Sequence, residues 1–273
     1  MTSIPGKVAV VTGAGSGIGR ALSVELARRG ALVAISDVDP QGLAETEVLV
    51  KGAGGEVKAD ILDVSQRELV LQYADEVVAH FGTVNLVFNN AGVAFTGDVE
   101  QMSFKEIDRV MDVDFGGVVN GTKAFLPHVI ASGEGHIINI SSVFGLFAVP
   151  TQSAYNAAKF AVRGFTEALR QEMKLRGRPV QVTTVHPGGI KTNIVNNSTG
   201  VDGFDHAKMA SDFNAKLART SPEKAAHVIL TGVEKNKAKV LIGTDAVIMD
   251  SVVRILGSKY QPLVTMFSRR NGV

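Results

Sequence analysis

The chain has no cysteine among its 273 residues. It therefore forms no disulfide, carries no thiol nucleophile and offers no thiolate to a metal ion. This composition fits a reducing compartment without requiring one. The six histidines are scattered and include no H-x-x-x-H pair, so we expect no metal site.

A strong charge imbalance and a long apolar run are also missing. Lysine and arginine number 28 against 27 for aspartate and glutamate, which gives a net charge of +1. No basic tract is dense enough to predict nucleic-acid binding. No apolar run reaches the roughly 18 residues that a spanning helix requires, and residues 1–7 lack the features of a signal peptide. We therefore expect a cytoplasmic protein.

Short β-branched apolar runs alternate with longer stretches that have helical length and spacing. The expected strands are Val8–Val11, Leu32–Ile35, Val84–Phe88, His136–Ile140 and Val180–Val185, and the expected helices lie near 18–29, 41–51, 66–80, 103–130 and 154–176. This alternation predicts an α/β fold with a parallel sheet covered by helices on both faces. No linker interrupts the pattern, so we expect one domain over residues 1–273.

Two stretches depart from this alternation. Residues 193–220 are rich in polar residues and glycine, which predicts an insertion. One short helix is expected near its end from the spacing of Met209, Phe213 and Leu217. Residues 245–256 place apolar side chains on one helical face and pair Asp250 with Arg254.

Three glycines lie between the first expected strand and the first expected helix. They are Gly13, Gly17 and Gly19, in the register G-x-x-x-G-x-G. Glycine there lets the backbone approach a pyrophosphate at a helix N-terminus, which favours negative charge. A glycine-rich turn without a ligand is the alternative, but the position in the first βα unit favours a phosphate loop.

Asp37 ends the second expected strand, eighteen residues beyond Gly19. A carboxylate there accepts hydrogen bonds from both adenosine ribose hydroxyls and repels a 2′-phosphate. Positions 16, 36 and 38 carry no basic residue, and we expect Arg20 to face outward from the first helical turn. The sequence therefore predicts NAD(H) in preference to NADP(H). In the alternative interpretation, Asp37 only begins the turn toward Asp39.

Tyr155 and Lys159 stand four residues apart on an expected helix and therefore share one face. A nearby ammonium group favours the phenolate, so Lys159 is expected to lower the Tyr155 pKa from its ordinary value of about 10. Ser142, thirteen residues upstream, can hold a substrate oxygen from an adjacent loop. Alone, such a Tyr–Lys pair is more often an exposed surface pair.

These features occur in order with Asn89-Asn-Ala-Gly92, and over roughly residues 5–195 the chain resembles the short-chain dehydrogenase/reductase family. The resemblance implies a Rossmann-type doubly wound parallel sheet that binds cofactor and substrate. It implies that the cofactor contacts Gly13, Ser16, Gly17, Ile18, Gly19, Asp37, Asp63, Val64, Asn90, Ala91, Gly92, Tyr155, Lys159, Pro187, Gly188, Ile190 and Thr192. Local alternatives remain, since Asp63 can cap the following helix and Pro187-Gly188 can be a plain turn.

By the same resemblance, Tyr155 is the general acid/base, Ser142 orients the substrate oxygen and Lys159 binds the nicotinamide ribose. Asp114 stands where the family usually carries an asparagine that helps hold a water beside the catalytic lysine. A buried carboxylate there favours the ammonium form of Lys159 and can titrate abnormally. We expect the relay to survive through the main chain.

The substrate and the assembly are indicated only by analogy. Positions similar to the family's pocket walls carry Phe95, Phe144, Phe147 and Val149, which implies an apolar alcohol or ketone, with core packing as the equal alternative. Residues 193–220 stand where the family has a substrate lid. Residues 245–273 form a C-terminal extension, for which packing is favoured over membrane contact. The analogy also implies a homodimer or homotetramer.

The leading interpretation is an NAD-dependent oxidoreductase that transfers a hydride to or from a secondary alcohol or ketone. One alternative is an NADPH-dependent 3-oxoacyl-type reductase, which Asp37 disfavours. Another is a non-catalytic NAD-binding regulator, which the complete set of Ser142, Tyr155 and Lys159 disfavours.

Overall fold

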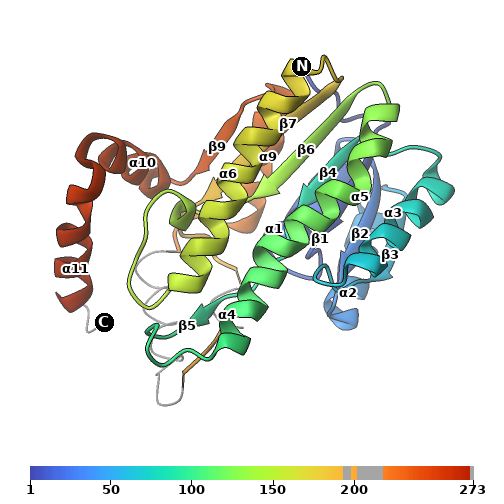
Figure 1. The fold of residues 1–273 in the computed structure, drawn as a ribbon. Helices are drawn as coiled ribbons and strands as arrows, with labels where there is room; N and C mark the ends of the chain where they lie inside the picture. The colour runs from blue at the N-terminus through green and yellow to red at the C-terminus, as the bar shows by residue number, and fades with distance from the viewer. Residues whose placement is uncertain (193–197, 202–217, 271–273) are drawn as a thin grey trace.

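A seven-stranded parallel sheet forms the centre of the computed structural model, which describes residues 1–192, 198–201 and 218–270 (Figure 1). The strand order is β3-β2-β1-β4-β6-β7-β9. Their bounds are β1 (Val8–Thr12), β2 (Leu32–Asp37), β3 (Val57–Ile61), β4 (Leu86–Asn89), β6 (Gly135–Ile140), β7 (Val180–Pro187) and β9 (Lys239–Ile242). The order reverses between β1 and β4, which confirms the predicted α/β, doubly wound sheet.

Helices cover both faces of this sheet. One layer consists of α1 (Gly17–Arg28), α2 (Pro40–Gly52) and α9 (Pro222–Glu234), and the other of α3 (Arg67–Phe81), α5 (Gly117–Ala131) and α6 (Ser153–Leu175). Each layer has its own apolar core against the strands. Strands β1 and β6 are buried along their whole length, as expected for parallel strands covered on both sides.

The helix expected over 103–130 is interrupted near its middle. Helix α4 (Phe104–Met111) begins with a capping box between Ser103 and Glu106, and a π-helix (Asp112–Gly116) then separates it from α5. A π turn holds one more residue than an α turn, and such turns are frequent at functional sites. Here it brings Asp114 into the interior, where its side chain is completely buried.

The remaining elements lie around the carboxyl ends of the strands and beyond β9. The short strands β5 (Phe95–Thr96) and β8 (Thr199–Gly200) pair in parallel, and a 3₁₀ turn, η2 (Val143–Gly145), follows β6. The chain ends in α10 (Thr244–Leu256), η3 (Gly257–Tyr260) and α11 (Gln261–Arg270), which project from the sheet in Figure 1. The predicted pairing of Asp250 with Arg254 is confirmed at 3.2 Å.

The short helix predicted from Met209, Phe213 and Leu217 lies outside the described residues. In the part of the chain that the structure describes, no helix has the length and apolar character needed to cross a membrane.

Candidate active site

The glycine-rich turn between β1 and α1 leaves no room for side chains. Gly13 has a φ of +66°, and a Cβ there would lie 2.7 Å from the Cα of Ala91. A Cβ at Gly19 would lie 2.0 Å from the carbonyl oxygen of Gly13. Both contacts are with backbone atoms, so the turn requires glycine at these positions.

The N-terminus of α1 fits an anionic group. The first turn, which includes Ile18, carries no acidic residue, and the N-cap Ser16 makes no side-chain hydrogen bond to the helix. The first N–H groups of a helix have no partner within the helix, and its dipole favours negative charge there. A pyrophosphate therefore fits this turn.

Hydrogen bonds between Asn90, which follows β4, and Thr12, which ends β1, fix the start of the phosphate loop. The amide nitrogen of Asn90 donates to the carbonyl oxygens of Thr12 and Gly13, at 2.9 and 3.1 Å. The Thr12 hydroxyl accepts from the backbone N–H groups of Asn90 and Ala91, at 3.0 and 3.1 Å. Thr12 was not among the predicted residues, although a hydroxyl at the carboxyl end of the first strand was a signal for it.

Asp37 binds two backbone groups with its two carboxylate oxygens. It accepts from the N–H of Gly15 at 2.7 Å and from the N–H of Asp39 at 3.0 Å. The second contact is the turn that the alternative interpretation proposed. The first one, however, ties the carboxylate to the phosphate loop, where a ribose would lie in a Rossmann site.

The expectation that Arg20 faces outward is wrong. Its guanidinium donates to the hydroxyl of Thr46 at 3.0 Å and to the carbonyl of Gly42 at 3.1 Å, and it pairs with Glu45 at 2.8 Å. It also donates to the carbonyl of Gly15. These partners on α2 and the loop occupy the guanidinium, because they satisfy most of its donors.

Asp63 and Val64 follow β3. Asp63 accepts from the N–H and the hydroxyl of Ser65, at 2.9 and 2.7 Å, so it stabilises the turn before α3, whose N-cap is Gln66 and not Asp63 as the alternative proposed. Val64 is buried, and its carbonyl accepts from the side chain of Asn120 at 3.0 Å. These contacts fix the backbone beside the end of the sheet.

The segment 187–192 lies between the phosphate loop and the C-terminal helices. The N–H of Gly188 donates to the carbonyl of Ile242 at 2.9 Å, and Ile190 is buried against the core. A Cβ at Gly17 would lie 3.1 Å from the methyl group of Thr192, so this segment reaches the start of α1. Asp245, which was not predicted, accepts from the N–H of Gly189 at 2.7 Å.

The predicted catalytic residues meet at the carboxyl ends of β4 and β6. Lys159 Nζ lies 3.0 Å from Asp114 Oδ2, with side chains 4% and 0% exposed. The other oxygen of Asp114 accepts from the N–H of Val93 at 2.7 Å. Lys159 Nζ lies 5.4 Å from the ring centroid of Tyr155, and a Cβ at Gly92 would be only 3.3 Å from Nζ. The carboxylate therefore contacts the lysine directly.

Burial and three neighbours set the acidity of Tyr155. Burial raises the pKa of Tyr155, and the Asp114 charge adds to this, while Lys159 and a hydrogen bond with Ser142 lower it. Lys159 thus acts in the expected direction, but the resulting pKa is above the ordinary value because burial outweighs the lysine. Burial lowers the pKa of Lys159, but Asp114 and Tyr155 reverse this and keep it raised.

Burial also raises the pKa of Asp114, against the opposing effect of Lys159. The abnormal titration expected for a carboxylate at this position is therefore present, and its cause is the loss of water around a fully buried group.

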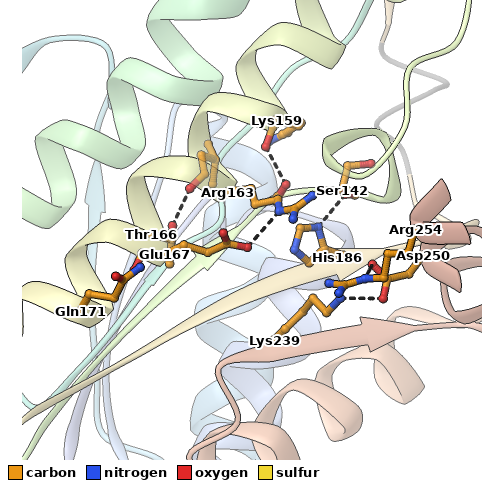
Figure 2. A network of polar contacts seen from close by, with 12 residues as sticks. Ser142, Lys159, Arg163, Thr166, Glu167, Gln171, His186, Lys239, Asp250 and Arg254 are labelled. Atoms are coloured by element: carbon orange, nitrogen blue, oxygen red, sulfur yellow. Dashed lines mark hydrogen bonds and ion pairs between the residues drawn. The ribbon is translucent and has the colours of Figure 1, made fainter. Parts of the chain in front are cut away.

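Ser142 is held from both sides at the end of β6. Its hydroxyl oxygen accepts from the N–H of Phe144 at 3.1 Å, and its carbonyl lies 2.9 Å from His186 Nδ1 (Figure 2). A carbonyl only accepts, so Nδ1 carries the proton. Burial lowers the pKa of His186 to about 4, which keeps the ring neutral. His186 was missed, although a polar residue directly before Pro187 was a signal.

Two of the predicted pocket residues pack near Tyr155, Phe144 against its ring and Phe95 in the same apolar cluster. The ring of Phe144 lies edge-to-face with Tyr155 at 6.3 Å and with Phe147 at 5.6 Å. Phe95 packs in the apolar cluster that also contains Tyr155, whereas Val149 packs with Phe147 in a separate cluster. Phe95, Phe144 and Phe147 therefore pack in apolar clusters, and Phe144 also contacts the ring of Tyr155.

Comparison with known proteins agrees with this arrangement. A model of the short chain dehydrogenase family matches residues 7–201. The chain belongs to this family. The members of this family are oxidoreductases that act on CH–OH and C=O groups of small molecules.

A curated relative and two solved structures illustrate the likeness. The chain is 61% identical over 264 residues to "Putative oxidoreductase SadH" of Mycobacterium tuberculosis (strain ATCC 25618 / H37Rv), covering 97% of this chain and 96% of that protein. A Burkholderia phymatum short chain dehydrogenase/reductase in complex with NAD has a TM-score of 0.88 at 29% identity, covering 94% and 95% of the two chains. A metagenomic short-chain oxidoreductase in complex with NADP has a TM-score of 0.72 at 29% identity, covering 88% and 98%.

Proposed function

We propose that this protein is an NAD(H)-dependent oxidoreductase of secondary alcohols and ketones, with Tyr155 as the general acid/base. The observation that carries the proposal is the buried contact of Lys159 with Asp114 beside Tyr155, at the edge of the sheet where the glycine turn fits a pyrophosphate. Burying a charge costs free energy even when it is paired, as Lys159 and Asp114 are, and groups with pKa values perturbed in this way are concentrated at active sites.

The side chains divide the proton chemistry between them. The Ser142 oxygen accepts from Phe144, and its hydroxyl, which bonds Tyr155, can donate to a substrate oxygen placed beside both side chains. Tyr155 gives a proton to that oxygen in reduction and takes one in oxidation. Lys159 remains an ammonium group because of Asp114, and its charge stabilises the phenolate when Tyr155 has lost its proton.

The cofactor supplies the hydride transfer when it is bound. Gly13, Ser16, Gly17, Ile18 and Gly19 would hold its pyrophosphate, and the remaining contacts would come from Asp37, Asp63, Val64, Asn90, Ala91, Gly92, Tyr155, Lys159, Pro187, Gly188, Ile190 and Thr192. Asp37 favours NAD(H), because a carboxylate repels a 2′-phosphate. Arg20 supports this preference, since its guanidinium is engaged with α2.

The substrate is proposed to be apolar, because Phe144 and Phe95 flank Tyr155. A carrier-linked 3-oxoacyl reductase that uses NADPH is disfavoured by Asp37 and by the engagement of Arg20. A non-catalytic NAD-binding regulator is disfavoured because Ser142, Tyr155, Lys159 and Asp114 are brought together intact. A single domain over 1–273, a lid over 193–220, a homodimer or homotetramer and a cytoplasmic location stay predictions.

The variant Tyr155→Phe tests the proposal. It removes the phenol proton and leaves the ring, so kcat on a panel of secondary alcohols and ketones should fall by about 10²–10⁴. NADH binding should change by less than about threefold, because the hydroxyl contributes one hydrogen bond among many. Stopped-flow absorbance and NADH fluorescence titration measure the two quantities.

Tyr73→Phe is the matched control, since Tyr73 is buried in the α3 layer away from this site. It should keep wild-type turnover. A Tyr155→Phe variant that retained more than about a tenth of the wild-type kcat would contradict the proposed role. A panel with no turnover by the wild type, together with tight NAD binding, would favour the regulator instead.

A further inference from the structure

The C-terminal arm, residues 244–270, contacts the active-site wall through a few specific residues. Among residues 244–269 only Ala246 is buried, so this stretch does not form part of the main core. Its inner side packs on the loop 143–149, which follows Ser142. The cluster they share contains Val143, Phe144, Phe147, Val149, Ala246, Met249, Val253, Tyr260 and Val264.

Tyr260 makes the most specific of these contacts. Its hydroxyl accepts a hydrogen bond from the N–H of Ala148 at 3.0 Å. Its ring lies edge-to-face with Phe147, with 6.2 Å between centroids and 85° between the planes. Ala148 is exposed, and the bond to Tyr260 gives its N–H a fixed partner in a loop without regular ladder bonds. Tyr260 therefore holds this loop by both its ring and its hydroxyl.

A chain of rings continues from Tyr260 to the proposed acid/base. Phe147 packs edge-to-face on Phe144 at 5.6 Å and 89°, and Phe144 packs on Tyr155 at 6.3 Å and 90°. Edge-to-face pairs fix the relative orientation of rings and stabilise the packing beyond the effect of their buried area. A shift of Tyr260 is therefore transmitted to the ring beside Tyr155.

The arm is also anchored at its other end. Asp245 accepts from the N–H of Gly189 at 2.7 Å, and a Cβ at Gly188 would lie 2.2 Å from the same carboxylate oxygen. The arm thus contacts both the loop 143–149 and the segment 187–192. Asp245 lies in the first turn of α10 and Tyr260 ends η3, which follows α10, so the two contacts come from the two ends of this part of the arm.

We propose that Tyr260 is a specificity-determining residue that sets how large an apolar alcohol or ketone the site accepts beside Tyr155. It does so by fixing Phe147, and through it Phe144, on the wall of the site. The inference rests on the proposed function, because it assigns the substrate side of the same centre. Loss of the Tyr260 ring lets the two phenylalanines move outward and widens the space beside Tyr155.

The test compares Tyr260→Ala with Tyr260→Phe across secondary alcohols that range from 2-propanol to ring-bearing alcohols. In Tyr260→Ala, the ratio of kcat/KM for the bulky over the small alcohol should rise at least about threefold, because the ring that holds Phe147 is lost. Tyr260→Phe keeps the ring and loses the hydroxyl, so the ratio should change by less than about threefold. Deuterium exchange of residues 143–149 should rise in both variants.

Leu263→Ala is the control, because Leu263 lies on the same arm and is half exposed. It should leave both the ratio and the exchange unchanged. An equal change of kcat/KM for all alcohols in Tyr260→Ala, or the same ratio change in Leu263→Ala, overturns this inference while the proposed function stands. A wild type that oxidises no alcohol and reduces no ketone overturns the proposed function, and this inference falls with it.

Discussion

The turn that fits the cofactor and the C-terminal arm constrain their residues in opposite ways. In the turn, backbone atoms meet, and the position of a Cβ at Gly19 is taken by the Gly13 carbonyl. In the arm, a few side chains contact the loop 143–149, and other residues, such as Ile255 at 82%, are largely exposed. The first kind of contact permits one amino acid, whereas the second permits many.

This difference explains why the cofactor side has a recognisable sequence and the substrate side does not. Where backbone atoms fill the space of a Cβ, as at Gly13 and Gly19, the position is restricted to glycine whatever the rest of the sequence is. A ring that packs on another ring, as Tyr260 does on Phe147, can be replaced by other pairs of similar size. Changes at the two places should therefore differ in size, and the following variants measure that difference.

The largest effect is expected for Gly19→Ala. Its Cβ would meet two groups that cannot yield easily, the Gly13 carbonyl at 2.0 Å and the Asn90 amide at 2.7 Å. Overpacking against backbone costs about 3 kcal/mol or more, and the turn that remains should bind NADH at least about tenfold more weakly. Urea unfolding and calorimetric titration with NADH measure both effects.

Two controls belong to this experiment. Gly164→Ala on α6 has open space and should be neutral or slightly stabilising, as alanine is the better helix former. Leu263→Ala in the arm should change stability by less than about 0.5 kcal/mol. If Gly19→Ala behaved like either control, the contrast between the two regions would be wrong.

Two buried histidines, both in the sheet and neither in the arm, should make the fold less stable as the pH falls from 7 to 5. Burial lowers the pKa of His136 to about 3 and that of His186 to about 4, and both lie on strands. An unfolded histidine has a pKa of about 6.5, so between these values the unfolded state binds more protons and stability falls as the pH falls. Each histidine should lower the free energy of unfolding by about 2 kcal/mol at pH 5 relative to pH 7.

His136→Asn removes one of these groups and should reduce the loss between pH 7 and pH 5 by about 2 kcal/mol. Urea unfolding at several pH values, followed by circular dichroism, gives this slope. His80→Asn is the control, since His80 is exposed on α3. A slope that stayed the same in His136→Asn would show that the buried ring is not the titrating group.

The smallest of these effects is expected for Asp37→Ser, which alters a side chain on the cofactor side without adding a backbone clash. Serine cannot accept from two ribose hydroxyls and does not repel a 2′-phosphate, so the preference for NADH over NADPH should fall about tenfold. The ratio of the two dissociation constants measures it. Asp39→Ser, on the neighbouring exposed residue, should keep the wild-type ratio.

The sequence allowed the sheet and the glycine turn to be predicted, because buried parallel strands are continuous apolar runs and the turn has a backbone rule. It missed β3 and β9, since these edge strands include polar residues such as Lys58 and Lys239. The periodicity over 103–130 indicated one helix, and nothing in it marked the π turn that buries Asp114.

The errors at the site have one physical cause. Arg20 binds residues of α2 that lie more than twenty positions further along the chain. His186, on β7, binds the carbonyl of Ser142, which lies 44 positions earlier. The pKa of Tyr155 is raised because burial outweighs the opposing effect of Lys159. Contacts between distant segments and the exclusion of water follow from the packed fold and leave no local pattern.

The π turn at Asp112–Gly116 makes the helix locally less stable but directs Asp114 toward Lys159. A regular α-helix has better hydrogen bonds than a π turn, so removing one residue there would let α4 and α5 join into a straighter and locally more stable helix. Each residue of an α-helix advances by about 100° around the axis. The same deletion would therefore rotate Asp114 away from Lys159, and the chain keeps its carboxylate in the site by retaining the less stable helix.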